Sequence, residues 1–355
     1  CTGNDRRPVD SVQRTARHFS KGTRASILRL ILFYWILIYS SIAFANYNYQ
    51  WRNFTRYQDD LTSNTIRKIV VGKTGQVWVA TDQGLLRFDG FWHQVPLAAP
   101  SSENLGVSPA QISILDLLVD RRGNLWIATN IGIFIGQWPS DRQQMVWTSF
   151  QTQKTGLLAD YISVITERRN GEVWVGTPVG VCWQRLGDKS WQKVQTPYVT
   201  GIYEDLQNQL WLAHQPASRV ADGLALLTLI EPDGKNWQLF GTQDGLPNGQ
   251  IQAMVTDRQN RLWVGTTKGL VIYNEQKWSA DFRSLDLIGH NVQTLHFDQN
   301  QILWVGTNQG IRLLTDLNSG NEVAYQHLTK SNGIAGNNIT TLCESPSGNI
   351  WVGTR

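Results

Sequence analysis

Cysteine and methionine are both scarce in this sequence, with three and two residues among 355. The cysteines, Cys1, Cys182 and Cys343, lie far apart and match neither a metal-ligand spacing nor a disulfide framework. We therefore expect one tail thiol and two small core residues, with no metal site and no cofactor. No methionine precedes Met145, so we expect the natural N-terminus to be missing or misassigned.

Two further features are absent: amphipathic helical periodicity after residue 50, and a basic stripe. The net charge is +4, but residues 1–29 hold seven basic and two acidic residues, a net +5, which leaves −1 for the rest. Nucleic-acid-binding domains cluster lysine and arginine where the phosphates run. The sequence therefore argues against nucleic acid as a partner, and the missing 3.6-residue period argues against helical repeats.

A long apolar run follows the basic tail. Residues 27–45, ILRLILFYWILIYSSIAFA, contain a single charge, Arg29. About 20 apolar residues are enough for a helix to span a bilayer, and basic flanks stay in the cytoplasm. We expect residues 1–26 to be a cytoplasmic tail and residues 27–45 a transmembrane helix or a signal peptide. The AFA ending suits cleavage by signal peptidase, so both alternatives stay open.

A tryptophan-centred motif recurs seven times in residues 46–355. It reads QVWVATDQGLLRF from residue 76, RLWVGTTKGLVIYN from residue 261 and NIWVGTR at the end of the sequence. The motif tryptophans are Trp78, Trp126, Trp174, Trp211, Trp263, Trp304 and Trp351. Their mean spacing, about 45 residues, indicates a repeat architecture. Each unit holds four short β-type runs separated by Gly, Asn and Asp turns. We predict an all-β fold, a β-propeller of about seven four-stranded blades.

The repeated residues have structural roles in this prediction. The tryptophan fills the space between neighbouring blades. The small residue that follows it, such as Gly265 or Ala80, lets the sheets approach closely. The glycine after the next turn supplies backbone freedom. We expect the Asp and Asn residues of the turn before the tryptophan to bond to their own turn backbone rather than to a metal ion.

The ends of the repeat region predict how the ring closes. The segment WRNFTRYQDDLTSNTIRKI from Trp51 matches WTSFQTQKTGLLADYISVI from Trp147, so residues 51–55 are predicted to form an outer strand. Propellers often pair such a strand into their last blade, which leaves no exposed sheet edge. The seventh unit ends after its tryptophan strand, and we therefore expect the last blade to be truncated in this sequence.

The repeat resembles that of the two-component regulator propeller family. The resemblance rests on DRRGNLWIAT in the second unit, LWVGT in the fifth, and the joining segments DGLPNGQI and NGIAGNNI. It covers residues 51–355 and departs in the fourth unit, where His214 replaces the threonine and the turn lengthens to QPASRVADG. The resemblance implies an extracytoplasmic sensor that signals to a cytoplasmic histidine kinase or diguanylate cyclase.

We therefore expect an exported, ligand-sensing propeller of a membrane-bound signal-transduction protein, lying on the periplasmic or extracellular side of the cell membrane. A lyase-type propeller enzyme and a protein-assembly scaffold stay open as alternatives, as does a homodimer. We predict no catalytic residue, because none of the six histidines has an acidic partner at a telling spacing.

The candidate ligand site is the channel mouth where the blade-joining loops meet the inner strands. The residues just before the first apolar residue of each inner strand are predicted to be Thr65, Gln111, Tyr161, Tyr198, Gln250, Asn291 and Asn338. Only Tyr161 and Tyr198 are aromatic, and they belong to adjacent blades. With Arg67 and the lengthened turn that begins at His214, they are predicted to bind a small polar or carbohydrate-like ligand. The alternative is that both tyrosines only plug the channel.

Overall fold

A computed structural model describes residues 49–57, 59, 61–98, 108–139, 144–185, 187–188, 190–215, 226–230, 237–246, 250–279, 287, 290–315, 317 and 324–355. The chain divides into two compact units, residues 1–50 and 51–355, and the fold concerns the second. The basic tail and the apolar run predicted for residues 1–45 lie outside the described residues. Within the described ranges, no helix has the length and apolar character that a membrane span requires.

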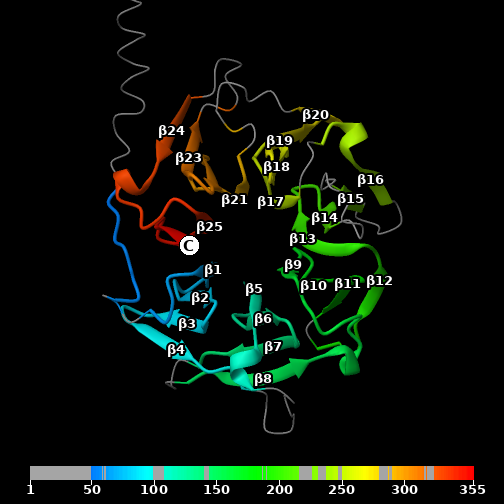
Figure 1. Ribbon diagram of the computed structural model, residues 1–355. Helices are drawn as coiled ribbons and strands as arrows, with labels where there is room; N and C mark the ends of the chain where they lie inside the picture. Colours follow the sequence, from blue (N-terminus) through cyan, green and yellow to red (C-terminus); the bar gives the residue numbers. More distant parts are fainter. Residues whose placement is uncertain are drawn as a thin grey trace, which may run out of the picture. The chain divides into compact units, whose positions relative to one another are not determined.

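Seven antiparallel sheets follow one another around a ring, each built from strands that are consecutive in the chain (Figure 1). The innermost strands are β1 (Ile66–Val71), β5 (Ile114–Val119), β9 (Val164–Glu167), β13 (Tyr198–Glu204), β17 (Ile251–Thr256), β21 (Val292–Phe297) and β25 (Ile339–Glu344). The second strands, which carry the motif tryptophans, are β2 (Val77–Thr81), β6 (Leu125–Thr129), β10 (Glu172–Thr177), β14 (Leu210–Gln215), β18 (Leu262–Thr266), β22 (Leu303–Thr307) and β26 (Ile350–Thr354).

Six of the sheets have two further strands. The third strands are β3 (Gly84–Phe88), β7 (Gly132–Gln137), β11 (Gly180–Arg185), β15 (Leu226–Ile230), β19 (Gly269–Asn274) and β23 (Gly310–Thr315). The fourth strands are β4 (Trp92–Val95), β8 (Val146–Gln151), β12 (Gln192–Gln195), β16 (Trp237–Phe240), β20 (Lys277–Ser279) and β24 (Ala324–Leu328). Short 3₁₀ helices lie at Pro109–Gln111, Gln153–Thr155, Thr242–Asp244 and Lys330–Asn332.

The ring is closed. Each innermost strand contacts the innermost strands of both neighbouring sheets, and β25 contacts β1. The predicted all-β propeller is therefore confirmed. Of the predicted seven four-stranded blades, the described residues form six four-stranded sheets and a seventh of two strands, β25 and β26. β26 ends at Thr354, one residue before the last residue of the sequence.

The motif tryptophans form the core between sheets, as predicted, with one exception. Six of them are at most 6% exposed, and only Trp351 is half-buried. Trp126, for example, packs in one apolar cluster with Ile162 and Ile165 of the next sheet. A buried indole removes a large apolar area from water, so this position contributes strongly to every interface between sheets.

Close approach of neighbouring sheets requires a small residue two positions after the motif tryptophan, in the second strand of each sheet. A Cβ added at Gly265 would lie 2.5 Å from Cγ1 of Val292 on the next inner strand. The glycine at the start of the third strand is required for a different reason. Gly180 has a φ of +145°, and an added Cβ would also collide with the carbonyl oxygen of Val194.

The turn between the innermost and second strands, here called the inner turn, is held by its own aspartate. The Oδ1 of Asp120 accepts hydrogen bonds from the backbone N–H groups of Arg122 (2.9 Å) and Asn124 (2.8 Å). Its Oδ2 accepts from Nε1 of Trp126 at 2.9 Å. The same aspartate-to-indole bond recurs in three other sheets. The predicted turn bonding is confirmed, and the carboxylate additionally anchors the core tryptophan.

Residues 51–55 lie beside the seventh sheet. Asn53 Nδ2 donates to the carbonyl oxygen of Gly333 at 2.9 Å, and the ring of Phe54 stacks on Trp351 with centroids 6.0 Å apart. The segment is not a strand, contrary to the prediction, because none of the described strands pairs with it. A cavity of about 320 Å³ separates this segment from β26.

Candidate functional site

The two tyrosines predicted to share a channel mouth lie side by side. Tyr198 begins β13, and Tyr161 precedes β9 of the neighbouring sheet. Their ring centroids are 6.4 Å apart and their planes are inclined by 81°. This edge-to-face arrangement is the one that the ring quadrupoles favour. Tyr161 is 39% exposed, so the pair presents an accessible aromatic surface.

Tyr198 is electrically neutral at physiological pH. Burial, and then a hydrogen bond to Tyr161, raise the pKa of Tyr198 to about 12. A phenol with this pKa stays protonated and remains a hydrogen-bond donor. The two rings together therefore offer apolar faces and hydroxyls, a combination that suits an uncharged polar ligand.

The other two predicted site residues lie elsewhere. Arg67 is exposed on the bulge between Ile66 and Lys68 of β1, and no described hydrogen bond or ring contact joins it to the tyrosines. His214 is only 2% exposed. Its Nε2 lies 2.8 Å from Oγ1 of Thr228 and its Nδ1 lies 3.2 Å from the carbonyl oxygen of Pro197. Burial lowers the pKa of His214, opposed by the Pro197 bond. His214 is thus an interior residue, and ligand binding by the four residues stays a prediction.

The strand register corrects one residue at the channel mouth. Ile114 pairs with Thr129 as Ile66 pairs with Thr81, so Ser113 rather than Gln111 takes the position before the second inner strand. The sequence misled here because Ile112 is also apolar and lies two residues earlier, on the same face of an extended chain.

Several polar side chains of the channel already have partners in the adjacent sheet. The hydroxyl of Ser163 donates to the carbonyl oxygen of Val199, and that of Thr340 donates to the carbonyl oxygen of Ile66 at 2.6 Å. The polar positions that predicted a wet channel mouth are therefore in part inter-sheet contacts.

An ion pair between a partly exposed lysine and a buried aspartate joins three sheets. Lys68 Nζ lies 2.9 Å from Oδ1 of Asp116, and this carboxylate raises the pKa of Lys68. The Oδ2 of Asp116 accepts from the backbone N–H of Ile165 at 3.0 Å. Both carboxylate oxygens of Asp116 have partners, so this pair joins the first three sheets of the ring.

Two histidines do have acidic partners, which the sequence spacing did not predict. His93 Nε2 lies 2.9 Å from Oδ1 of Asp89 across the β3–β4 hairpin. His296 Nε2 lies 3.5 Å from Oε2 of Glu344 on the neighbouring inner strand. Burial lowers the pKa of His296, and Glu344 opposes this shift. Among the described residues, no group of three or more His, Cys, Asp or Glu side chains is arranged to hold a metal ion.

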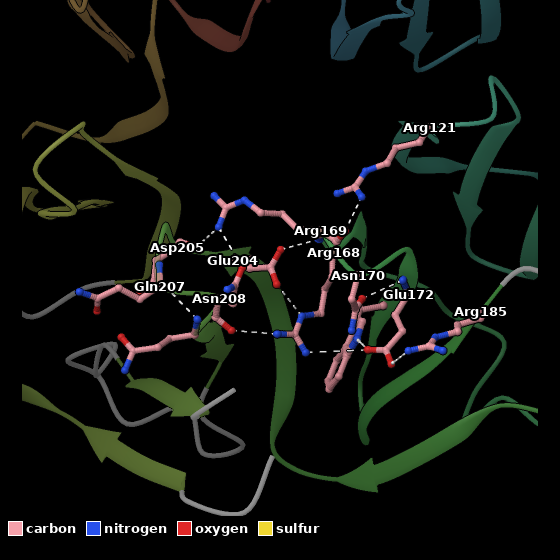
Figure 2. Close-up of polar contacts among 12 residues, drawn as sticks. Arg121, Arg168, Arg169, Asn170, Glu172, Arg185, Glu204, Asp205, Gln207 and Asn208 are labelled. Atoms are coloured by element: carbon pink, nitrogen blue, oxygen red, sulfur yellow. Dashed lines mark hydrogen bonds and ion pairs between the residues drawn. The ribbon is translucent and has the colours of Figure 1, made fainter. Parts of the chain in front are cut away.

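The opposite ends of the inner strands carry a network of ion pairs and hydrogen bonds that the sequence did not predict (Figure 2). Arg168 Nε lies 2.9 Å from Oε1 of Glu204, and its Nη2 donates to the carbonyl oxygen of Asn208 at 2.8 Å. Arg169 donates its backbone N–H to Oε2 of Glu204 at 2.6 Å, and its guanidinium donates to the carbonyl oxygen of Asp205. These contacts bind the third sheet to the fourth.

The network repeats around the ring in one direction. At three interfaces, the second residue of an inner turn donates its N–H to a glutamate at the end of the next inner strand. The pairs are Arg121 to Glu167 (2.9 Å), Arg169 to Glu204 (2.6 Å) and Gln299 to Glu344 (3.0 Å). These three glutamates occupy the same position at the end of their inner strands, and this recurrence in the sequence could have predicted the network.

The fold is that of a β-propeller protein. Three of its segments, residues 108–130, 245–268 and 333–355, match the family model described as two component regulator propeller. The chain therefore carries repeats of the two-component regulator propeller type in its second, fifth and seventh sheets. Among curated proteins, none matches the chain significantly.

Solved structures share this fold at low sequence identity. The extracellular domain of a hybrid two component system from B. thetaiotaomicron has a TM-score of 0.66 and 18% identity over 85% of this chain and 40% of that one. PorZ, a surface component of the type-IX secretion system of Porphyromonas gingivalis, has a TM-score of 0.62 and 14% identity over 86% and 47%. Virginiamycin B lyase from Staphylococcus aureus has a TM-score of 0.57 and 14% identity over 82% and 92%. The chain thus spans less than half the length of the first two.

Proposed function

We propose that this propeller is the exported ligand-sensing region of a membrane-bound signal-transduction protein, which relays its state to a cytoplasmic histidine kinase or a similar output domain. The ligand is small, polar and uncharged, carbohydrate-like in its mix of apolar faces and hydroxyls. It binds at the channel mouth beside Tyr161 and Tyr198.

The tyrosine pair is the observation that carries this proposal. Two tyrosine rings from adjacent sheets meet edge to face, and Tyr161 is accessible to a ligand. Aromatic faces with a few convergent polar groups are typical of small-molecule sites. Because β9 and β13 belong to different sheets, a ligand that contacts both rings would respond to, and bias, the relative position of two sheets. The family and the extracellular hybrid two component relative support a sensor role.

Ligand screening tests the binding site. A library of small polar metabolites is screened against the 355-residue chain by thermal shift, and each hit is titrated by calorimetry. Tyr161→Ala and Tyr198→Ala are expected to weaken binding while leaving the melting temperature of the free protein nearly unchanged. Tyr325→Ala is the matched control, because Tyr325 is a similarly exposed tyrosine (40%) on the outer strand β24. Unchanged affinity in both channel-mouth variants would remove this pair as the site.

The exported location is tested separately. The basic tail and the apolar run of residues 27–45 support a propeller outside the cytoplasmic membrane. Alkaline phosphatase fused after residue 60 is expected to be active, and a fluorescent protein that matures only in the cytoplasm is expected to be dark. The reverse pair of signals would contradict a sensor of external ligands.

A further inference from the structure

A polar cavity lies between the fourth and fifth sheets, at the end of the inner strands opposite the tyrosine pair. Its volume is about 580 Å³. Its walls are the two inner turns of residues 205–209 and 257–261, the hairpin turn of residues 274–276, and Gln238 of β16. This volume falls within the range of about 300–1,000 Å³ that small-molecule sites occupy.

The lining is dominated by carboxamides. Seven of the twelve lining residues are Asn or Gln, and they come from all four of these segments. Trp211 and Leu262, both almost fully buried, and Tyr273 also line the cavity. Carboxamides both donate and accept hydrogen bonds without carrying charge. The cavity is therefore suited to a ligand that itself alternates donors and acceptors.

Two carboxylates belong to the lining, and they differ in exposure. Asp205 lines the cavity but is 2% exposed, and it accepts from two turn N–H groups and from the indole of Trp211. Glu275, in the exposed hairpin turn, is the other acid of the lining, and no lysine or arginine belongs to it. An anionic ligand would meet Glu275 with no cation opposite, so the lining disfavours an anion.

The inner turn of the fourth sheet lacks the bridging cation that four other sheets have. At four other interfaces a lysine or arginine of the inner turn reaches the backbone carbonyl of the next inner turn. These bridges run from Lys73 to Arg121, from Arg121 to Arg169, from Arg169 to Asp205 and from Arg258 to Gln299. Figure 2 shows the second and third of them.

At the interface between the fourth and fifth sheets, the corresponding residue is Leu206. Its side chain cannot make that bond. Its backbone N–H instead donates to Oδ1 of Asn260 at 2.8 Å. The fifth inner strand ends in Thr256, whereas three others end in glutamate. The two inner turns are tied together by this bond, and the space that a cation spans elsewhere stays open between carboxamides.

We propose that this cavity is a second binding site, which takes an uncharged, multiply hydroxylated ligand such as a neutral saccharide. Vicinal hydroxyls pair with the donor and acceptor ends of Asn and Gln side chains, and no charge has to be desolvated. The proposal does not depend on the tyrosine pair, which lies at the other end of the inner strands.

The test uses the full chain and four defined probes: maltotriose, cellotriose, xylotriose and, as the acidic counterpart, trigalacturonate. Calorimetry is expected to detect at least one neutral trisaccharide and not trigalacturonate. Leu206→Arg restores the bridging residue of the other interfaces and is expected to weaken binding at least about tenfold. Gln299→Arg places the same residue at the same turn position of the sixth sheet and is expected to leave affinity unchanged.

A second variant guards against misfolding of Leu206→Arg. Gln238→Ala combined with Gln259→Ala truncates two exposed carboxamides and is expected to lose about tenfold in affinity, as the removal of two hydrogen bonds predicts. Three results would overturn the proposal: no neutral trisaccharide binds, only trigalacturonate binds, or these variants bind as the parent does. Binding that Tyr161→Ala abolishes and Leu206→Arg preserves would also overturn it, by assigning the saccharide to the channel mouth.

Discussion

The indole of Trp51 packs on Gly333 as the indoles of Trp191 and Trp278 pack on Gly156 and Gly245. A Cβ added at Gly333 would lie 3.1 Å from Cδ1 of Trp51, and one at Gly245 would lie 3.0 Å from Cβ of Trp278. Trp191 and Trp278 adjoin or belong to the fourth strands of their sheets. Trp51 therefore takes the fourth-strand position of the seventh sheet, although it comes from the beginning of the repeat region.

This relationship predicts the effect of removing the Trp51 ring. Trp51→Ala is expected to lower the free energy of unfolding by about 3 kcal/mol, the lower end for large aromatic truncations. Urea unfolding followed by tryptophan fluorescence measures it. Tyr57→Ala is the control in the same segment, because Tyr57 is 87% exposed and should change stability by less than about 0.5 kcal/mol. Equal effects of the two substitutions would mean that residues 51–55 do not close the ring.

Asp120 is expected to be more important than its location in a surface turn indicates. Asp120→Ala leaves the buried indole N–H of Trp126 and two turn N–H groups without an acceptor. Unpaired buried donors cost about 1–3 kcal/mol each, so we expect a loss of at least about 3 kcal/mol in urea unfolding. Asp89→Ala, in an exposed hairpin turn, should cost no more than about 1 kcal/mol. A loss as small as this for Asp120→Ala would show that water replaces the carboxylate.

Gly265 tests the close approach of the fifth and sixth sheets. Gly265→Ala places a methyl group 2.5 Å from Cγ1 of Val292, and such overpacking costs about 1–3 kcal/mol. The double variant Gly265→Ala with Val292→Ala removes the methyl that collides. Its loss of stability is expected to be smaller than the sum of the two single losses. Strict additivity in this double-mutant cycle would contradict a direct clash.

His214 predicts a dependence of stability on pH. Burial lowers its pKa from the ordinary value of 6.5, so below pH 6.5 the unfolded state binds a proton that the folded state resists. The contribution of neutral His214 to the free energy of unfolding is therefore fully present above pH 6.5. It is lost as the pH falls toward the lower pKa of the folded state. His214→Thr, which restores the residue of the other repeats, should flatten the stability curve between neutral pH and about pH 5. Parallel curves for the two proteins would exclude His214 as the source.

The fold could be predicted from the sequence because the same motif recurs seven times. The spacing of the tryptophans, the small residue after them and the glycine of the next turn each identify one strand or turn, and the structure has them where the repeat predicts. Register failed at the second inner strand, where Ile112 and Ile114 both fit the apolar position. The local apolar pattern does not distinguish two residues on the same face of a strand. The pairing of Ile114 with Thr129 does identify the first residue of this strand.

The sites were harder to predict because they depend on neighbouring repeats rather than on one repeat. Tyr161 and Tyr198 were recognised as adjacent because each interrupts a polar series. His214 was predicted to belong to the ligand site because the lengthened turn begins there, but its position in the threonine register buries it. The carboxamide cavity went unnoticed because Leu206 is an ordinary residue by itself. Its meaning appears only beside Arg121, Arg169 and Arg258 at the same position.

The contact between Asn53 and Gly333 spans 280 positions of the chain, whereas each inner strand meets the next after a single repeat. The entropic cost of closing a loop grows with its length, and non-local contacts slow folding. The sheets can therefore fold one after another during synthesis of the chain, and each folded sheet stabilises the next. Closure of the ring has to wait for both ends, and it is expected to be the last and slowest step of folding.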